Sequence, residues 1–486
     1  MIFNSYEFIF AFLPAVWIGY FLLNKWQLFF VRNVWLVISS LFFYSWWNPV
    51  YLPLILASML INYYIGTLLG KASSQPRARL LLTAGITANL AALGYYKYYD
   101  FFIENLNTLL STDFNLLHLA LPLAISFFTF QQIAYLVDAY RKETKEYDFW
   151  KYALFVSFFP QLIAGPIVHH NEMMPQFSRE KAQRNFHYEN FAKGIFIFSI
   201  GLFKKVVIAD TFAVWASAGF DQAEALTFIE AWIVSLSYTF QLYFDFSGYT
   251  DMAMGAALLF NVRLPINFNS PYKAVNIQDF WKRWHMTLTR FLTQYLYIPL
   301  GGNRKGIPRT YVNVFLVFFV SGLWHGAGWT FVLWGTLHGA ASMLNRLWQQ
   351  LGFKMNKFLG WFITFQFVNF AWVFFRAQTW EDAEKVLKGM IGMSGFSWPE
   401  QLTSFFSPAS VQAVEILFIN AATDTSLLYM LALLGAAFPI TLWARNSVRM
   451  MDQLKPSWFS AFFICALLLI SFFSMTRVSE FLYFNF

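Results

Sequence analysis

Apolar runs of about 20 residues, separated by short polar turns, follow one another along almost the whole chain. One bilayer crossing by an α-helix needs about 20 such residues. The pattern therefore predicts an all-α fold, that of a polytopic transmembrane protein with about 10 to 13 spans and some interrupted or re-entrant helices. We expect a single transmembrane domain over residues 1–486, with N-terminal spans in 1–113, a catalytic core in 114–345 and C-terminal spans in 346–486.

The polar turns predict how the chain is oriented. The opening stretch "MIFNSYEFIFAFLPAVWIGYFLL" has no Lys or Arg before its apolar run and no small-x-small cleavage site, which favours a first span over a cleaved signal peptide. Turns rich in Lys and Arg then alternate with turns that lack them, and basic turns mark the cytoplasmic side. Because Arg445, Arg449 and Lys455 precede the last run, both termini are expected on the far side of the membrane from the cytoplasm.

The middle of the chain, from 150 to 310, departs from this regular pattern. Its apolar pieces are broken by Pro and Gly, as in "FFPQLIAGPI", "FSGYTDMAMGA" and "YIPLGGNRKGIP". Interrupted helices at membrane depth are tolerated only where they pack in protein or line a cavity. The functional site is therefore expected in this central part.

Composition agrees with a membrane protein and excludes a nucleic-acid-binding one. Hydrophobic residues make up 58% of the chain and charged residues only 12%, against about 25% charged in soluble domains. The net charge of +8 comes from Lys and Arg in short turns, not from a continuous basic domain. The single cysteine, Cys465, cannot form an intrachain disulfide or a cysteine metal cluster, and we expect it to be buried as a small apolar residue.

The most basic segment runs from Arg263 to Arg309 and contains one acid, Asp279. Within it, residues 276–299 have the spacing of one amphipathic helix at the membrane surface, with Trp284 on the apolar face and His285 beside Lys282 on the polar face. Two interpretations remain open. In the first, the basic residues set topology and contact lipid phosphates. In the second, they bind an anionic cytoplasmic substrate such as a nucleotide cofactor, and the residues concerned are Lys282, Arg283, Trp284, Arg304 and Lys305.

Two further histidines lie in apolar sequence, in "SGLWHGAGWTFVLWGTLHG". His325 stands between Trp324 and Gly326, and the glycines around it allow close approach or a broken helix, which makes it the better catalytic candidate. On one continuous helix His338 would lie about 20 Å away on the opposite face. Its small neighbours favour a structural hydrogen bond between helices.

Two intramembrane carboxylates, Asp245 and Asp251, lie in "QLYFDFSGYTDMAMG". They could relay protons or orient a histidine, and we favour a structural or orienting role. There is no G-x-S-x-G, Walker or H-E-x-x-H motif, and no ligand set that would predict a metal. A histidine acting as general base on a hydroxyl is the simplest catalytic interpretation. A proton-coupled transporter using Asp245, Asp251 and His325 is the rival from another class, but no paired repeat is visible.

Five blocks of the sequence, in register, resemble the membrane-bound O-acyltransferase (MBOAT) family, and specifically its alginate O-acetyltransferase (AlgI) branch. They are "LPLAISFFTFQQIAYLVDAYR", "FFPQLIAGPI", "QLYFDFSGYTDMAMG", "DFWKRWHMTLTRFLTQYLYIPLGGNRKG" and "SGLWHGAGWTFVLWGTLHG". The resemblance implies a ring of helices around a central funnel. It also implies that His325 is the catalytic base and that His285 matches the second family histidine.

The resemblance further implies a reaction and a location. An acetyl group from cytoplasmic acetyl-CoA, the donor substrate rather than a permanently bound cofactor, would cross the bacterial inner membrane to a hydroxyl acceptor. The branch acts with a periplasmic acetyltransferase partner, so the resemblance leaves two acceptors open, a partner side chain and a polysaccharide such as alginate. Peptidoglycan or cellulose O-acetylation and D-alanylation stay open as alternatives. Membrane lipids are expected partners, and nucleic acid is not.

Overall fold

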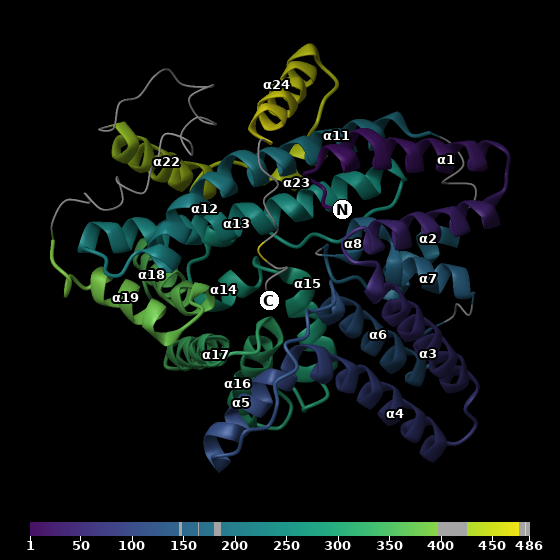
Figure 1. Ribbon diagram of the computed structural model, residues 1–486, viewed down its shortest axis with the longest axis horizontal. Coiled ribbons are helices and arrows are strands. Elements are labelled where there is room, and N and C mark those ends of the chain that lie inside the picture. The colour runs from purple at the N-terminus through teal and green to yellow at the C-terminus, as the bar shows by residue number, and fades with distance from the viewer. Residues whose placement is uncertain (145–147, 164, 179–185, 397–424, 476–481, 483–486) are drawn as a thin grey trace. The chain divides into compact units, whose positions relative to one another are not determined.

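The computed structural model describes residues 1–144, 148–163, 165–178, 186–396, 425–475 and 482 (Figure 1). Every regular element in these residues is helical, as the apolar pattern predicts. Within the described residues, four helical stretches are long and apolar enough to cross a membrane, namely Glu7–Lys25, Pro49–Lys71, Ile307–His325 and Lys357–Arg376. Three shorter apolar helices accompany them, at Phe29–Ser45, Met430–Leu442 and Trp458–Ser474. The count of 10 to 13 spans stays a prediction.

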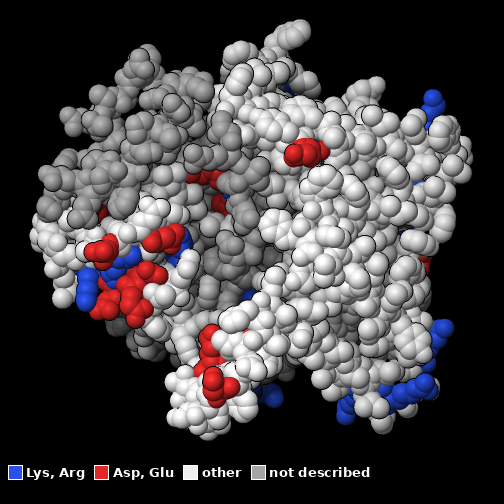
Figure 2. Space-filling model, viewed as in Figure 1, with Lys and Arg blue, Asp and Glu red and all other residues white. Residues whose placement is uncertain are grey.

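The chain divides into two compact units. Unit 1 holds Met1–Phe198 with Met252–Pro265, and unit 2 holds Ser199–Asp251 with Ile266–Leu482. The subdivision at 113 and 345 stays a prediction, and every candidate site residue lies in unit 2. The face shown in Figure 2 is largely free of charged side chains, which gather in a few patches. Large exposed apolar residues are what a lipid-facing surface requires.

Unit 1 is a set of helices connected by short turns. One buried cation is held inside it: Arg32 donates to the side-chain oxygens of Asn24 at 3.0 Å and Asn33 at 2.9 Å, and to the carbonyl of Phe177 at 3.2 Å. The helices are α1 (Leu13–Lys25), α2 (Phe29–Ser45), α3 (Leu52–Lys71), α4 (Gln75–Leu93), α5 (Tyr99–Leu110), α6 (Ile125–Tyr140), α7 (Phe149–Ser157), α8 (Phe159–Leu162), α9 (His170–Ser178) and most of α11 (Tyr188–Phe203).

Unit 2 contains the longest helix of the described chain, α13 (Phe228–Leu259), which continues into unit 1 after Asp251. Its other elements are the π-helical turn η4 (Lys204–Ala209), α12 (Asp210–Ser217), η5 (Ala218–Gln222), η6 (Pro271–Lys273), α14 (Ile277–Trp281), α15 (Met286–Leu292), η7 (Thr293–Tyr297), α16 (Ile307–His325), α17 (Trp329–Gln350), α18 (Lys357–Arg376), α19 (Trp380–Met390), α22 (Thr425–Leu442), α23 (Ser447–Asp452) and α24 (Trp458–Ser474).

The expected single helix over 276–299 is wrong. The structure has three short helices, α14, α15 and η7, and the break falls at His285, whose φ of 43° and ψ of 52° are left-handed. The cause is the segment around Asn267, whose carbonyl accepts from the N–H of Met286 at 3.0 Å. That bond and the side-chain bonds of Asn267 replace helical i→i−4 bonds, which the amphipathic spacing does not reveal.

The stretch from Ser321 to Gly339 is also not one helix. α16 ends at His325, and α17 begins at Trp329 and packs back on α16. A Cβ atom on Gly322 would lie 2.4 Å from the carbonyl oxygen of Phe331 and 3.1 Å from Cα of Gly335. Only glycine fits at this approach, so the pair closes as a tight hairpin. The separation of about 20 Å expected for His325 and His338 on one helix therefore does not apply.

Cys465 corrects another expectation, because it is exposed and not buried. It lies on α24, whose apolar side chains are largely exposed, among them Trp458, Phe459 and Phe462. An apolar residue on a membrane helix can face lipid as well as the protein interior, and sequence pattern alone does not distinguish the two.

Candidate active site

His325 is the last residue of α16 and is buried. Its ring lies against three aromatic rings, with centroid distances of 4.9 Å to Trp324, 5.1 Å to Trp334 and 5.1 Å to Phe375. These residues come from α16, α17 and α18, so the imidazole is in contact with both helices of the α16–α17 hairpin and with α18. A base in such an apolar setting is shielded from water, as acyl transfer without hydrolysis requires.

Gly326 follows His325 and ends the helix with an extended backbone. A Cβ atom added there would lie 2.2 Å from the ring of Phe331, well inside contact distance. Phe331 in turn packs edge-on against Phe375, which touches His325. The glycine therefore lets the hairpin close without displacing the rings that hold the imidazole.

We expect Gly326→Ala to lower activity by about tenfold or more and to destabilise the protein by about 1–3 kcal/mol, because overpacking a dense core has this effect. Gly328→Ala is the matched control: its backbone is also extended, but the nearest atom to an added Cβ is 3.7 Å away. Activity and thermal unfolding in detergent would be compared for both variants. Equal activities would show that the close approach at Gly326 does not matter.

His285 is completely buried, not at a surface beside Lys282 as expected. Its Nδ1 lies 3.0 Å from Oδ1 of Asn267, and that oxygen also accepts from the N–H and the hydroxyl of Thr287 at 3.3 and 3.0 Å. Because the Thr287 N–H can only donate, the Asn267 atom is the oxygen and Nδ1 carries the proton of His285. Nε2 is then the basic nitrogen.

Burial lowers the pKa of His285 to about 3, so the imidazole is neutral at physiological pH. It lies outside the four helices long enough to cross a membrane. Its ring packs edge-on against Phe246 at 4.9 Å and lies 6.2 Å from Trp324. Since Trp324 also touches His325, both candidate histidines lie near the same indole ring, which the sequence pattern did not predict. Asn267 is a site residue that sequence reasoning missed.

His338 is buried on α17, and its Nδ1 accepts a hydrogen bond from the indole N–H of Trp281 on α14 at 3.3 Å. This is a hydrogen bond between helices of the kind predicted for it. Its ring also lies 4.8 Å from that of Trp334, which in turn touches His325. The hairpin thus brings both histidines into contact with one tryptophan, a residue that the sequence analysis did not single out.

The two carboxylates of α13 are each paired with a lysine of η4. Asp245 lies 2.8 Å from Nζ of Lys205, and Asp251 lies 2.8 Å from Nζ of Lys204. Lys205 also contacts Asp210 at 2.8 Å. Lys205, Asp245 and Asp251 are buried, whereas Lys204 and Asp210 are partly exposed. Removing one partner of a buried ion pair is strongly destabilising. The structural or orienting role favoured from the sequence stays a prediction, and the consecutive lysines are partners that the sequence analysis missed.

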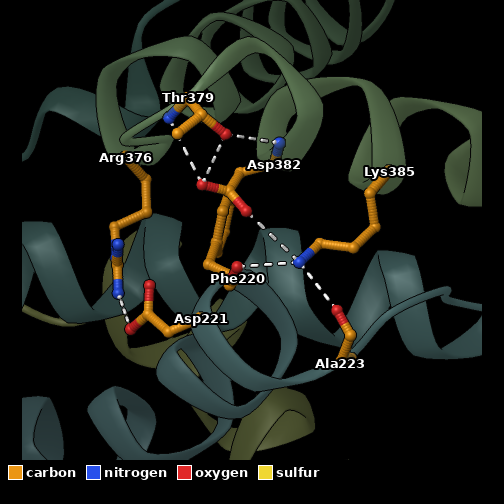
Figure 3. Close-up of polar contacts among 7 residues, drawn as sticks. All are labelled: Phe220, Asp221, Ala223, Arg376, Thr379, Asp382 and Lys385. Carbon is orange, nitrogen blue, oxygen red and sulfur yellow. Dashed lines mark hydrogen bonds and ion pairs between the residues drawn. The ribbon is translucent and has the colours of Figure 1, made fainter.

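The end of α18 is fixed just beyond the ring that touches His325 (Figure 3). Arg376, next to Phe375, contacts Oδ2 of Asp221 at 2.5 Å. Thr379 and Asp382 form a capping box that starts α19, and Lys385 donates to the carbonyls of Phe220 and Ala223 at 2.8 Å each. These contacts tie α18 and α19 to η5 and so hold Phe375 in place.

The five residues proposed for an anionic substrate have different surroundings. Lys282, Arg304 and Lys305 are exposed. Arg283 contacts Asp279 at 2.8 Å, the one acid of the basic segment. Trp284 is buried against Trp372, with ring centroids 5.0 Å apart. The three exposed cations are thus the ones available to an anion, whereas Trp284 packs as a core residue.

No group of three or more His, Cys, Asp or Glu side chains suited to a metal ion occurs within the described part of the chain. The site offers instead a shielded imidazole at the end of α16, a second neutral imidazole with a fixed tautomer, and a set of exposed cations. Such an arrangement can deprotonate a hydroxyl in a dry environment.

Comparison with known proteins decides the family. The family model of MBOAT, the membrane-bound O-acyltransferase family, matches residues 47–379, which include all of these site residues. The chain belongs to this family. The MBOAT protein described here is therefore a membrane-embedded O-acyltransferase, as its sequence blocks indicated.

Curated relatives of this MBOAT protein differ in the acceptor that their names give. A peptidoglycan O-acetyltransferase of Helicobacter pylori is 48% identical, over 100% of this chain and 98% of its own. A probable alginate O-acetylase AlgI of Pseudomonas aeruginosa is 39% identical, over 82% of this chain and 76% of its own. A teichoic acid D-alanyltransferase of Bacillus subtilis is 26% identical, over 52% of this chain and 68% of its own.

Proposed function

We propose that this MBOAT protein transfers an acetyl group from cytoplasmic acetyl-CoA across the inner membrane to a hydroxyl acceptor, for O-acetylation of a glycan outside the cytoplasm. The observation that carries the proposal is the placement of His325, buried at the end of α16 among three aromatic rings. A neutral imidazole there can take the proton of the acceptor hydroxyl as that oxygen attacks the thioester carbonyl. The ring of His285 lies 6.2 Å from that of Trp324, which also touches His325, and His285 is proposed as the second histidine of the site.

The glycan is proposed to be peptidoglycan. The alginate-like polysaccharide inferred from sequence blocks is the second candidate, because an alginate O-acetylase is similar over 82% of the chain. The similarity to a peptidoglycan O-acetyltransferase favours the first, since it is higher and extends over 100% of this chain. Both acceptors are hydroxyl-bearing glycans, so the chemistry at His325 is the same for each.

The proposal also includes the orientation of the chain in the membrane and a periplasmic partner protein. With both termini periplasmic, the basic turns face the cytoplasm, where the phosphates of acetyl-CoA would meet the exposed cations Lys282, Arg304 and Lys305. A periplasmic acetyltransferase would then receive the acetyl group and complete the transfer. The direct acceptor at His325 would in that case be a side chain of this partner.

The proposal is tested with purified protein in detergent and acetyl-labelled acetyl-CoA, in the presence and absence of the periplasmic fraction of the same cells. Release of CoA that the periplasmic fraction stimulates is expected. Ester-linked acetate would then be measured on peptidoglycan and on secreted polysaccharide from cells with and without the gene. No use of acetyl-CoA in any condition would refute acetyl transfer, and loss of acetate from only one glycan would identify the acceptor.

Removing two exposed cations should weaken donor binding without affecting chemistry. We expect Arg304→Gln with Lys305→Gln to raise the KM for acetyl-CoA about tenfold and to leave kcat unchanged, because hydrogen bonds to charged phosphates are worth about 1.5–3 kcal/mol. Arg283→Gln is the control, since that guanidinium is already paired with Asp279. A KM equal to that of the wild type in the double variant would assign these cations to membrane topology.

A further inference from the structure

Two side chains of α17, Trp334 and His338, place N–H groups near His325 that have no partner among the described residues. Trp334 and His338 are four residues apart, so they lie on the same face of the helix. Both are fully buried, with 0% of their surface exposed, and their ring centroids are 4.8 Å apart. Trp334 also touches the ring of His325, at 5.1 Å. The candidate base therefore lies next to this pair.

The hydrogen bond from Trp281 fixes the proton of His338. An indole N–H can only donate, so Nδ1 of His338, 3.3 Å from it, must be the unprotonated nitrogen. The neutral ring then carries its proton on Nε2. Neither Nε2 of His338 nor Nε1 of Trp334 has a hydrogen-bond partner among the residues that the structure describes. Two buried donors thus have no acceptor within the described part of the chain.

Unpaired buried donors are costly, at about 1–3 kcal/mol each, and native proteins retain few of them. Two such groups next to a catalytic base therefore point to a ligand that supplies the acceptor. The surroundings are aromatic and uncharged: His338 also contacts Phe367 at 5.2 Å and Trp372 at 6.2 Å. The exposed cations are the groups suited to a phosphate. The N–H groups of Trp334 and His338 suit a different acceptor, an oxygen atom that is neutral at first and gains negative charge during the reaction.

We propose that the indole N–H of Trp334 and the Nε2–H of His338 hold the carbonyl oxygen of the acyl thioester and stabilise the oxyanion that forms on it. This inference rests on the proposed acetyl transfer. As the acceptor oxygen bonds to the carbonyl carbon, His325 takes its proton and the C=O electron pair moves to the oxygen facing the two donors. When the C–S bond breaks, the C=O bond re-forms and the proton on His325 goes to the departing CoA sulfur.

Kinetics of donor variants test the assignment. Trp334→Phe and His338→Phe keep an aromatic ring but remove the N–H, and each should lower kcat about 100-fold with the KM for acetyl-CoA within about twofold. His338→Gln retains an N–H donor near the Nε2 position and should recover about tenfold of the loss. Trp361→Phe is the matched control, because its indole N–H is already satisfied by the carbonyl of Tyr272 at 2.9 Å, and its kcat should equal that of the wild type.

Trp281→Phe separates catalysis from structure. If His338 only accepts a hydrogen bond from Trp281, then Trp281→Phe and His338→Phe should lower kcat equally, and that result would overturn the proposal. A wild-type kcat in Trp334→Phe would do so as well, and this variant decides the matter if His338→Phe does not fold. Wild-type enzyme that transfers no acetyl group would instead refute the proposed function, before any donor variant is compared.

Discussion

Replacement of His325 by alanine is expected to abolish acetyl transfer and to leave the protein folded in the membrane. A positioned general base contributes about 10²- to 10⁴-fold to the rate, so kcat should fall by at least 100-fold. Folding should survive, because the rings of Trp324, Trp334 and Phe375 also pack against other aromatic residues. CoA release and acetate transfer would be measured on purified protein, with thermal unfolding in detergent as the measure of stability.

His325→Gln tests whether the alanine variant loses activity only because it loses stability. Glutamine fills most of the volume of histidine and keeps a hydrogen-bonding group, but it cannot take a proton at neutral pH. Its activity should be as low as that of the alanine variant, while its unfolding temperature stays closer to that of the wild type. Activity at the wild-type level in either variant would end the assignment of His325 as the base.

The second large effect is expected on stability, from Lys205→Met. This change removes the cation that lies 2.8 Å from both Asp245 and Asp210, and Asp245 is then left buried without its counter-ion. Breaking a buried ion pair at one partner is destabilising by about 3–5 kcal/mol. We expect a clear fall in the unfolding temperature and in the amount of folded protein recovered from membranes.

Adding Asp245→Leu to Lys205→Met should restore much of the loss, because an apolar pair of similar volume carries no buried charge. Lys193→Met is the control, since the partner of Lys193 is the exposed Glu189 and solvent screens such a pair. Its unfolding temperature should match that of the wild type. A Lys205→Met protein as stable as this control would show that the buried pair contributes nothing to the fold.

The sequence predicted the helical class and the unusual position of His325 for physical reasons that are visible in it. Runs of about 20 apolar residues leave few alternatives to membrane helices. The position of His325 between an apolar run and "GAGW" indicated a break in the helix, and α16 does end at His325. Close packing at Gly326 was likewise foreseeable, because glycine is the residue used where backbones and rings approach.

The surroundings of His285 and His338 could not be predicted, because long-range contacts decide them. Asn267 interrupts the helix at His285 from 18 residues away, and helical periodicity carries no sign of such competition. His338 meets Trp334 and His325 only because α16 and α17 fold into a hairpin. Likewise, the identity of the cations opposite Asp245 and Asp251 depends on how η4 packs against α13.

The paired charges on η4 and α13 also have a mechanical consequence. Lys204 and Lys205 are adjacent in the chain, whereas Asp245 and Asp251 are separated by more than one helical turn. Two ion pairs at different positions along the axis of α13 restrain both the axial position and the rotation of α13 against η4. A shift of α13 by one helical turn along η4 would break both ion pairs at once. These two elements are therefore expected to move together as a rigid part of unit 2. Any movement that admits an acceptor to His325 must therefore come from other helices, not from a shift of α13 along η4.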